Sequence, residues 1–110
     1  MELSDKPADS AVILAVTGRI DMTTSNEFCE RLSAMLAGGR PVVIDFSGVN
    51  YISSAGLRAL MLASKQARST GTGLAIAALQ PVVLEIFQIS RFDQLVPCHS
   101  TVEAALASVR

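Results

Sequence analysis

The chain has 110 residues, of which 50% are hydrophobic and 17% are charged, so it is long enough for one core and too apolar to be disordered. Nine Lys and Arg stand against ten Asp and Glu, for a formal net charge of −1, with one Tyr, four Phe and no Trp. Scattered charge without a basic stripe, together with so few aromatic rings, argues against nucleic-acid binding.

The start of the chain and its cysteines indicate a cytoplasmic protein. Residues 1–5 are polar and acidic, unlike a secretory signal, and no run approaches the ~20 apolar residues that span a bilayer. Cys29 and Cys98 lie far apart without a His at ligand spacing, so we expect free, mostly buried thiols and neither metal nor cofactor. We expect one monomeric domain over residues 1–110, without membrane contact.

The first half of the chain predicts a strand, a helix and a second strand. The apolar, β-branched run 11–16, ended by Gly18, is typical of a strand buried on both faces. A Thr-x-x-Glu capping-box pattern at 24–27, followed by an apolar residue at every fourth position, predicts a helix over about 25–37. Residues 42–46 predict the second strand.

The second half continues the alternation. After a turn at 47–50 we expect, in order, a helix to about Ser69, a strand at 74–77, a helix from Pro81 and a last helix opened by a capping-box pattern at 100–103. Alternating strands and helices imply βαβ units with right-handed crossovers. The predicted fold class is therefore α/β, with a small, mostly parallel mixed sheet.

The most informative stretch is 45–62, where a buried strand leads into a helix with Ser53 and Ser54 at its start. A serine there can be an ordinary N-cap, which stabilises a helix by about 1 kcal/mol. The same position tolerates a phosphate, because a helix start carries unpaired N–H donors and a partial positive charge. A phosphate would leave the fold intact and obstruct a closely packed partner, as a switch requires.

The helix after Ser54 has two faces when its residues are placed at 100° each. The expected core face consists of Leu57, Leu60, Met61, Ser64 and Ala67. Leu62 falls within the polar face, with Ala55 and Ala59 beside it. Either Leu62 is one ordinary exposed leucine, or it belongs to an apolar contact patch that begins at Ser54 and runs along the helix.

At these residues the chain resembles the STAS domain family, specifically the bacterial anti-sigma factor antagonists. The resemblance rests on five segments in the family's order: Gly18–Asp21, Val43–Ser47, Ile52–Leu57, Phe87–Asp93 and Glu103–Leu106. It implies a STAS fold, in which a small mixed, mostly parallel β-sheet packs against about four α-helices.

The resemblance also implies a partner-switching mechanism. The unphosphorylated antagonist binds an anti-sigma factor that is a serine kinase of the histidine-kinase-like ATPase type, and the regulated target is released. The kinase phosphorylates the start of the second helix, the complex dissociates, and a PP2C-type phosphatase resets the cycle. By its position in the motif, the acceptor is Ser54. The resemblance places Asp21, in the matching turn, on the same binding surface. With the residues of the helix start and its outer face, the predicted partner-binding set is Asp21, Ser53, Ala55, Arg58 and Leu62.

One residue departs from the family pattern. Many members carry Asp immediately before the acceptor, and this chain has Ser53 there, which leaves Ser53 open as a less favoured acceptor. A catalytic Ser54 is disfavoured, because Ile52 stands where a nucleophile elbow needs Gly. His99, the one histidine, is expected in a polar surface loop without a carboxylate to orient it, so we expect no enzyme.

A second function stays open. Small STAS proteins also serve as accessory subunits of ABC-type lipid transport complexes, bound constitutively to the ATPase with no cycle of phosphorylation. The complete Ser-Ser-Ala-Gly-Leu motif at 53–57 favours the switch.

Overall fold

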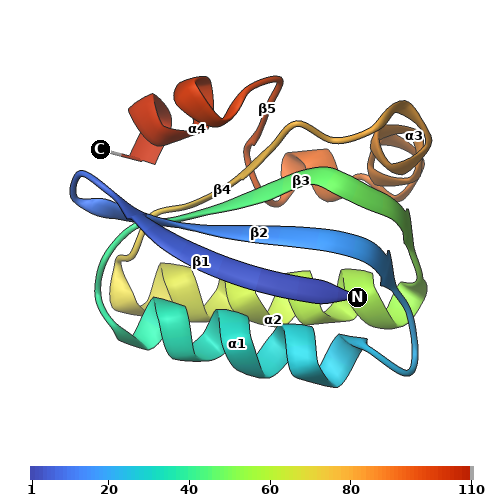
Figure 1. The fold of residues 1–110 in the computed structure, drawn as a ribbon, viewed down its shortest axis with the longest axis horizontal. Coiled ribbons are helices and arrows are strands. Elements are labelled where there is room, and N and C mark those ends of the chain that lie inside the picture. Colours follow the sequence, from blue (N-terminus) through green and yellow to red (C-terminus); the bar gives the residue numbers. More distant parts are fainter. Residues whose placement is uncertain (110) are drawn as a thin grey trace.

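The computed structural model describes residues 1–109, in which five strands form one sheet surrounded by four α-helices and a short 3-10 helix (Figure 1). The elements are β1 (Glu2–Ala8), β2 (Ala11–Ile20), α1 (Ser25–Ala37), β3 (Val42–Ile52), α2 (Ser54–Thr70), β4 (Leu74–Ala77), α3 (Pro81–Ser90), η1 (Phe92–Gln94), β5 (Cys98–His99) and α4 (Val102–Val109). The sheet order is β1-β2-β3-β4-β5; β1 is antiparallel to β2 and the other neighbours are parallel. The predicted fold class is confirmed.

Helices cover both faces of the sheet. In Figure 1, α1 and α2 lie side by side below the sheet, and α4 lies above it. The lower face holds the main core, which includes Leu14, Ile44 and Leu60, whereas Val43 and Ala105 belong to a smaller core under α4. Successive residues of a strand point to opposite faces, so β2 and β3 are apolar at nearly every position of their first halves.

Side-chain contacts fix the helices around β3. The Phe46 ring lies 6.3 Å from the ring of Phe28 in α1 and 6.1 Å from that of Phe87 in α3, measured between centroids. Ser33 in α1 donates its hydroxyl to Oε1 of Gln66 in α2 at 2.9 Å, and Nε2 of Gln66 donates to the Ser33 carbonyl at 3.0 Å. α2 therefore has two neighbours, the sheet and α1.

β3 is longer than the sequence predicted. The expected turn at 47–50 is wrong, because β3 runs unbroken through it, and β2 likewise continues past Gly18. The register between the two strands shifts twice along this stretch, so β3 accommodates extra residues in bulges. A Cβ on Gly48 would lie 2.5 Å from Cγ2 of Thr17, so glycine is needed where the bulged strand passes its neighbour.

Both capping-box predictions are wrong in detail. α1 has the predicted extent, but Thr24 does not cap it with its side chain. The Thr24 hydroxyl instead accepts from the Asp21 N–H at 2.9 Å and donates to the Arg19 carbonyl at 3.0 Å. At α4 the capping hydroxyl belongs to Thr101, which accepts from the Ala104 N–H at 3.1 Å, one residue later than predicted.

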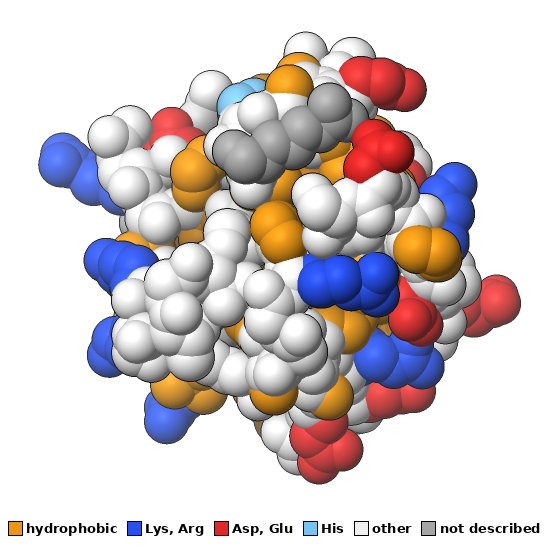
Figure 2. Space-filling view, turned by 90° about the vertical axis from the view of Figure 1, so that its left-hand side faces the viewer, with side chains coloured by type: hydrophobic (Ala, Val, Ile, Leu, Met, Phe, Trp, Pro, Cys, Tyr) orange, Lys and Arg blue, Asp and Glu red, His pale blue; other side chains and the backbone are white. Residues whose placement is uncertain are grey.

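The carboxyl ends of β2 and β3 and the starts of α1 and α2 meet at one end of the molecule, at the right of Figure 1. Figure 2 views the opposite end, where several Lys and Arg side chains project along the left edge and both signs of charge mix on the right. None of the helices in residues 1–109 has the length and apolar character needed to cross a membrane.

Candidate functional site

The two serines at the start of α2 are held differently. Ser53 is the N-cap, with an extended backbone (φ −92°, ψ 175°), and its Oγ accepts from the Gly56 N–H at 3.4 Å. Its own N–H donates to the Ile20 carbonyl at 2.9 Å, which ties the helix start to the end of β2. Ser54 is the first helical residue and is exposed, and its hydroxyl has no hydrogen-bond partner among residues 1–109. The Ser54 hydroxyl is therefore available, whereas that of Ser53 is engaged.

Gly56 accounts for the small residues that follow the serines. Gly56 is buried, and a Cβ on it would lie 2.6 Å from Cγ1 of Ile52 and 2.8 Å from Cγ2 of Ile20. Side chains do not pack that closely, so glycine alone lets the first turn of α2 approach the ends of β2 and β3. This close approach holds Ser54 beside the turn that follows β2.

Asp21 lies in that turn and carries a fixed negative charge. Its Oδ1 accepts from the Thr23 N–H at 2.9 Å and from the Thr23 hydroxyl at 2.7 Å, and its Oδ2 lies 3.6 Å from Nε of Arg19. The pKa of Asp21 is lowered from its usual value, first by the hydrogen bonds from Thr23 and then by Thr24 and the Arg19 charge.

Three further side chains add to this surface. Arg19 and Tyr51 are register partners in β2 and β3, and the Arg19 guanidinium carbon lies 4.3 Å from the centre of the Tyr51 ring. Met22, next to Asp21, is 83% exposed. None of these three residues was predicted as a site residue, and the one available sequence signal was that Met22 directly follows the matched residue Asp21.

A shallow groove of about 190 Å³ separates the starts of α1 and α2. It is lined by Ser25, Asn26 and Cys29 of α1 and by Ala55, Arg58, Ala59 and Leu62 of α2. Three of the predicted partner-binding residues thus line one groove, and Leu62 is 45% exposed within it. Asp21 and Ser53 do not line the groove. Sequence reasoning missed the contribution of α1, because the groove forms only when the two helices pack together.

The buried face of α2 is wider than predicted. Leu60 is buried as expected, whereas Leu57 and Met61 are only half-buried. Ala59, which was placed beside Leu62 on the polar face, is 4% exposed, because α2 packs against α1 as well as the sheet. Leu62 itself does lie on the outside.

Cys29 lines the groove with Arg58, whereas Cys98 and His99 form β5. Cys29 and Cys98 are free thiols and half-buried, and burial raises the pKa of Cys98 to about 11. His99 lies in β5 rather than in a surface loop, so that prediction is wrong. Its Nε2 is buried and has no hydrogen-bond partner among the described residues. Within residues 1–109 no three His, Cys, Asp or Glu side chains gather as a metal site requires.

The five-stranded mixed sheet with its covering helices is the fold of solved anti-sigma factor antagonists. Residues 4–97 match the family model described as "Mlab, STAS domain". The chain therefore belongs to the STAS domain family, as its motifs predicted.

Individual relatives agree with this assignment. BtrV of Bordetella bronchiseptica, named as an anti-sigma factor antagonist, is 34% identical over 111 residues, which cover 100% of this chain and 96% of BtrV. The crystal structure of an anti-sigma factor antagonist from Mycobacterium paratuberculosis is similar with a TM-score of 0.90 and 27% identity, covering 99% of this chain and 93% of that one. SpoIIAA, a Bacillus cell fate determinant solved in its phosphorylated form, has the same fold, with a TM-score of 0.73 and 15% identity over 99% of this chain and 100% of its own.

Proposed function

We propose that this protein is an anti-sigma factor antagonist that works by partner switching. Unphosphorylated, it binds an anti-sigma factor that is also a serine kinase of the histidine-kinase-like ATPase type, and it thereby frees the regulated target. Relatives named as such antagonists support the general role. The observation that carries the switch is the Ser54 hydroxyl, which is exposed at the start of α2 and unpartnered among residues 1–109.

The protein supplies one hydroxyl to the proposed cycle and no catalytic group. The kinase, in the cytoplasm, transfers the γ-phosphoryl group of ATP to Oγ of Ser54; the Oγ–P bond forms, the bond to the leaving ADP breaks, and the serine proton is lost. A PP2C-type phosphatase then hydrolyses the phosphoserine with water. The protein itself is thus the substrate of both enzymes rather than an enzyme.

Ser54 is a better acceptor than Ser53 on structural grounds. Phosphorylation of Ser53 would modify an oxygen that already accepts from the Gly56 N–H, and it would place the phosphate on a half-buried side chain. Phosphorylation of Ser54 breaks no hydrogen bond with residues 1–109. SpoIIAA shows that the fold itself is compatible with a phosphorylated state.

The proposed partner surface consists of Asp21, Ser53, Ala55, Arg58 and Leu62. Ala55, Arg58 and Leu62 line the groove directly after Ser54, so a partner seated there would contact the helix start. A phosphate brings nearly two negative charges to that position and must be desolvated under a bound partner. The groove supports the reading of Leu62 as part of a contact patch rather than a lone exposed leucine.

The first test is phosphosite mapping by mass spectrometry on protein purified from its own cells. We expect a single phosphate at Ser54, absent in Ser54→Ala and retained in Ser69→Ala, a matched change at the other end of α2. The partner kinase is then captured with Ser54→Ala, which should bind and resist release by ATP, whereas Ser54→Asp should bind at least about tenfold more weakly. A phosphate that persists in Ser54→Ala would move the acceptor to Ser53.

A second function has one observation in its favour, since the matching family model carries the description Mlab. In that case the protein would be an accessory subunit of an ABC-type lipid transport complex, bound constitutively to its ATPase. Absence of any phosphate in cells lacking the PP2C-type phosphatase, together with stable copurification of a transport ATPase, would select this role.

A further inference from the structure

Arg58 lies one helical turn after Ser54 and has no bonded partner among residues 1–109. Residues four apart on a helix are neighbours, with about 6 Å between their Cβ atoms, and an anion preceding a cation by four is the favourable order. Both side chains are exposed. Arg58 makes no hydrogen bond or ion pair with residues 1–109, whereas Arg19 at the neighbouring strand end is already paired with Asp21 and stacked on Tyr51.

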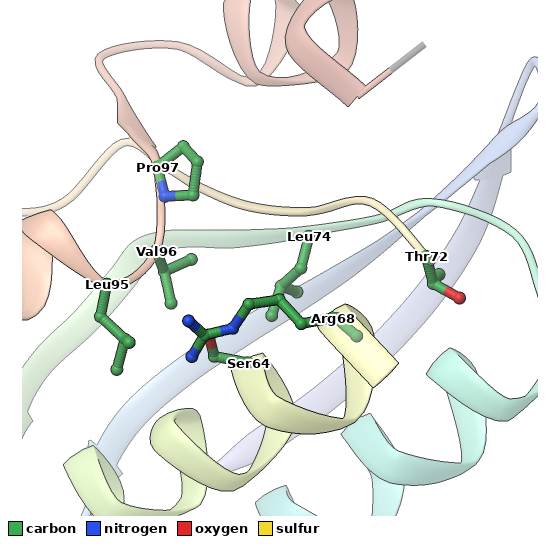
Figure 3. A pocket seen from close by; sticks show the side chains of 8 residues that line it. Ser64, Arg68, Thr72, Leu74, Leu95, Val96 and Pro97 are labelled. Atoms are coloured by element: carbon green, nitrogen blue, oxygen red, sulfur yellow. The ribbon is translucent and has the colours of Figure 1, made fainter. Parts of the chain in front are cut away.

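A second serine–arginine pair on the same helix shows that this spacing allows contact. Ser64 and Arg68 have the same separation, and Nη2 of Arg68 donates to Oγ of Ser64 at 3.3 Å. Figure 3 shows the Arg68 side chain folded back so that its guanidinium lies over Ser64. An arginine on α2 therefore reaches the residue four positions before it. A phosphate on Ser54 would extend beyond Oγ and shorten the gap that Arg58 must close.

We propose that Arg58 binds the phosphate of phosphorylated Ser54, and that this contact removes Arg58 from the partner-binding groove. This inference rests on the proposed function for the modification itself. A guanidinium donates two parallel hydrogen bonds to phosphate, and the charge on both groups strengthens them. Phosphorylation then changes the partner surface twice, because it adds a phosphate at the helix start and neutralises a cation within the groove.

The positive charge of Arg58 is important for partner binding because of the residues around it. The other residues lining the groove are neutral, so Arg58 is the single formal charge there. α2 as a whole contains Arg58, Lys65 and Arg68 and no Asp or Glu. The groove therefore favours a partner segment that places a carboxylate against Arg58 and an apolar side chain against Leu62. The phosphate of the same chain competes with that carboxylate for one guanidinium.

The test uses full-length protein with phosphoserine incorporated at position 54 during synthesis, and it needs no partner. The phosphorus NMR signal is followed through the second ionisation of the phosphate, which has a pKa of about 6 when unperturbed. Because Arg58 stabilises the dianion, the midpoint should lie about half a pH unit lower in the otherwise unchanged protein than in Arg58→Gln. Arg68→Gln removes the same group from the same helix, far from Ser54, and should leave the midpoint unchanged.

A second NMR measurement follows the Arg58 side chain directly. Its Nε–H signal in a nitrogen–proton spectrum should shift as the phosphate ionises, and should stay constant over the same pH range when Ser54 is unmodified. Equal phosphate midpoints in the unchanged protein and in Arg58→Gln would overturn the contact, even if cells do phosphorylate Ser54. Conversely, if the Arg58–phosphate contact is measured but Ser54 carries no phosphate in cells, the proposed partner switching is refuted. The contact would then be a property of the helix alone.

Discussion

The two ends of α2 carry the same pair of residue types, a serine followed four positions later by an arginine, in opposite states. Near the C-terminal end, Ser64 is 5% exposed and accepts a hydrogen bond from Arg68. At the start, Ser54 and Arg58 are exposed and neither is bonded to any of residues 1–109. The Ser64–Arg68 pair is bonded within the helix, whereas Ser54 and Arg58 are accessible to a binding partner.

The two serine–arginine pairs have the same spacing in the sequence, so their different states result from their different surroundings. Ser64 faces a hollow of about 180 Å³ that is walled by Leu74, Leu95 and Val96, so its hydroxyl needs a partner from the protein (Figure 3). Ser54 is the first residue of the helical turn that approaches the sheet through Gly56, and its side chain is exposed. The difference shows that the Ser64–Arg68 pair is fixed by its surroundings, whereas Ser54 and Arg58 remain accessible from solvent.

The largest expected effect separates Gly56, in the first turn of α2, from Gly71, the C-cap residue that follows α2. Gly56→Ala should lower the free energy of unfolding by about 3 kcal/mol, because the new Cβ collides with Ile52 and Ile20 in the core. Gly71→Ala should cost about 1 kcal/mol, because that residue has φ 71° and open space around it. Urea unfolding measures both values. Equal losses would show that the helix start tolerates a wider approach than we infer.

The element pattern was predictable, and the details that depend on neighbours were not. The extents of α1 and β4 follow from local signals, namely a four-residue apolar spacing and a short apolar run between glycines and a loop. The turn predicted at 47–50 failed because Ser, Gly and Asn also mark a bulge, and only the pairing with β2 tells the two apart.

The candidate site also combines features that depend on local sequence with features that depend on the packing of neighbouring elements. The position of Ser54 at an exposed helix start follows from a motif that is local in sequence, and its role as the acceptor stays a prediction. Asn26 and Cys29 enter the groove only because α1 lies against α2, a contact that Ser33 and Gln66 secure and that no single-helix pattern reveals. Ala59 was misplaced for the same reason, since a helix with two neighbours buries more than one stripe.

The next effect distinguishes the two serines of the helix start. Ser53→Ala should lower the free energy of unfolding by about 1 kcal/mol, because it removes the cap on the Gly56 N–H. Ser54→Ala should change it by less than about 0.5 kcal/mol, as expected for an exposed residue without a partner. Thermal and urea unfolding of the two variants side by side give the answer. A reversed order would make Ser54 the structural serine and withdraw the proposed acceptor.

A comparable effect is expected at the two arginines. Arg68→Gln should cost about 1 kcal/mol of unfolding free energy, because the buried Ser64 hydroxyl loses its donor. Arg58→Gln should leave stability within about 0.3 kcal/mol of the starting protein when Ser54 is unmodified, since nothing in residues 1–109 is bonded to it. Similar losses in both variants would mean that Arg58 already has a partner within the fold and is not available to a phosphate on Ser54.

The smallest effect concerns the acid dependence of the turn beside Ser54. Asp21 has a pKa below its usual value of 3.8, because Thr23 donates two hydrogen bonds to the carboxylate. A lowered folded-state pKa favours the ionised, folded form, so Asp21 stabilises the fold above its unfolded-state pKa and this contribution is lost as the pH falls through the folded-state pKa. Unfolding followed from pH 6 down to pH 2 should therefore show a shallower loss of stability in Asp21→Asn than in the unchanged protein.

Asp5→Asn is the control for removal of a surface carboxylate, because Asp5 pairs with Arg31 on exposed surface away from this turn. If Asp21→Asn leaves the acid limb as steep as in the unchanged protein, the pKa of Asp21 is not lowered by folding, and the fixed charge assigned to the partner surface loses its basis.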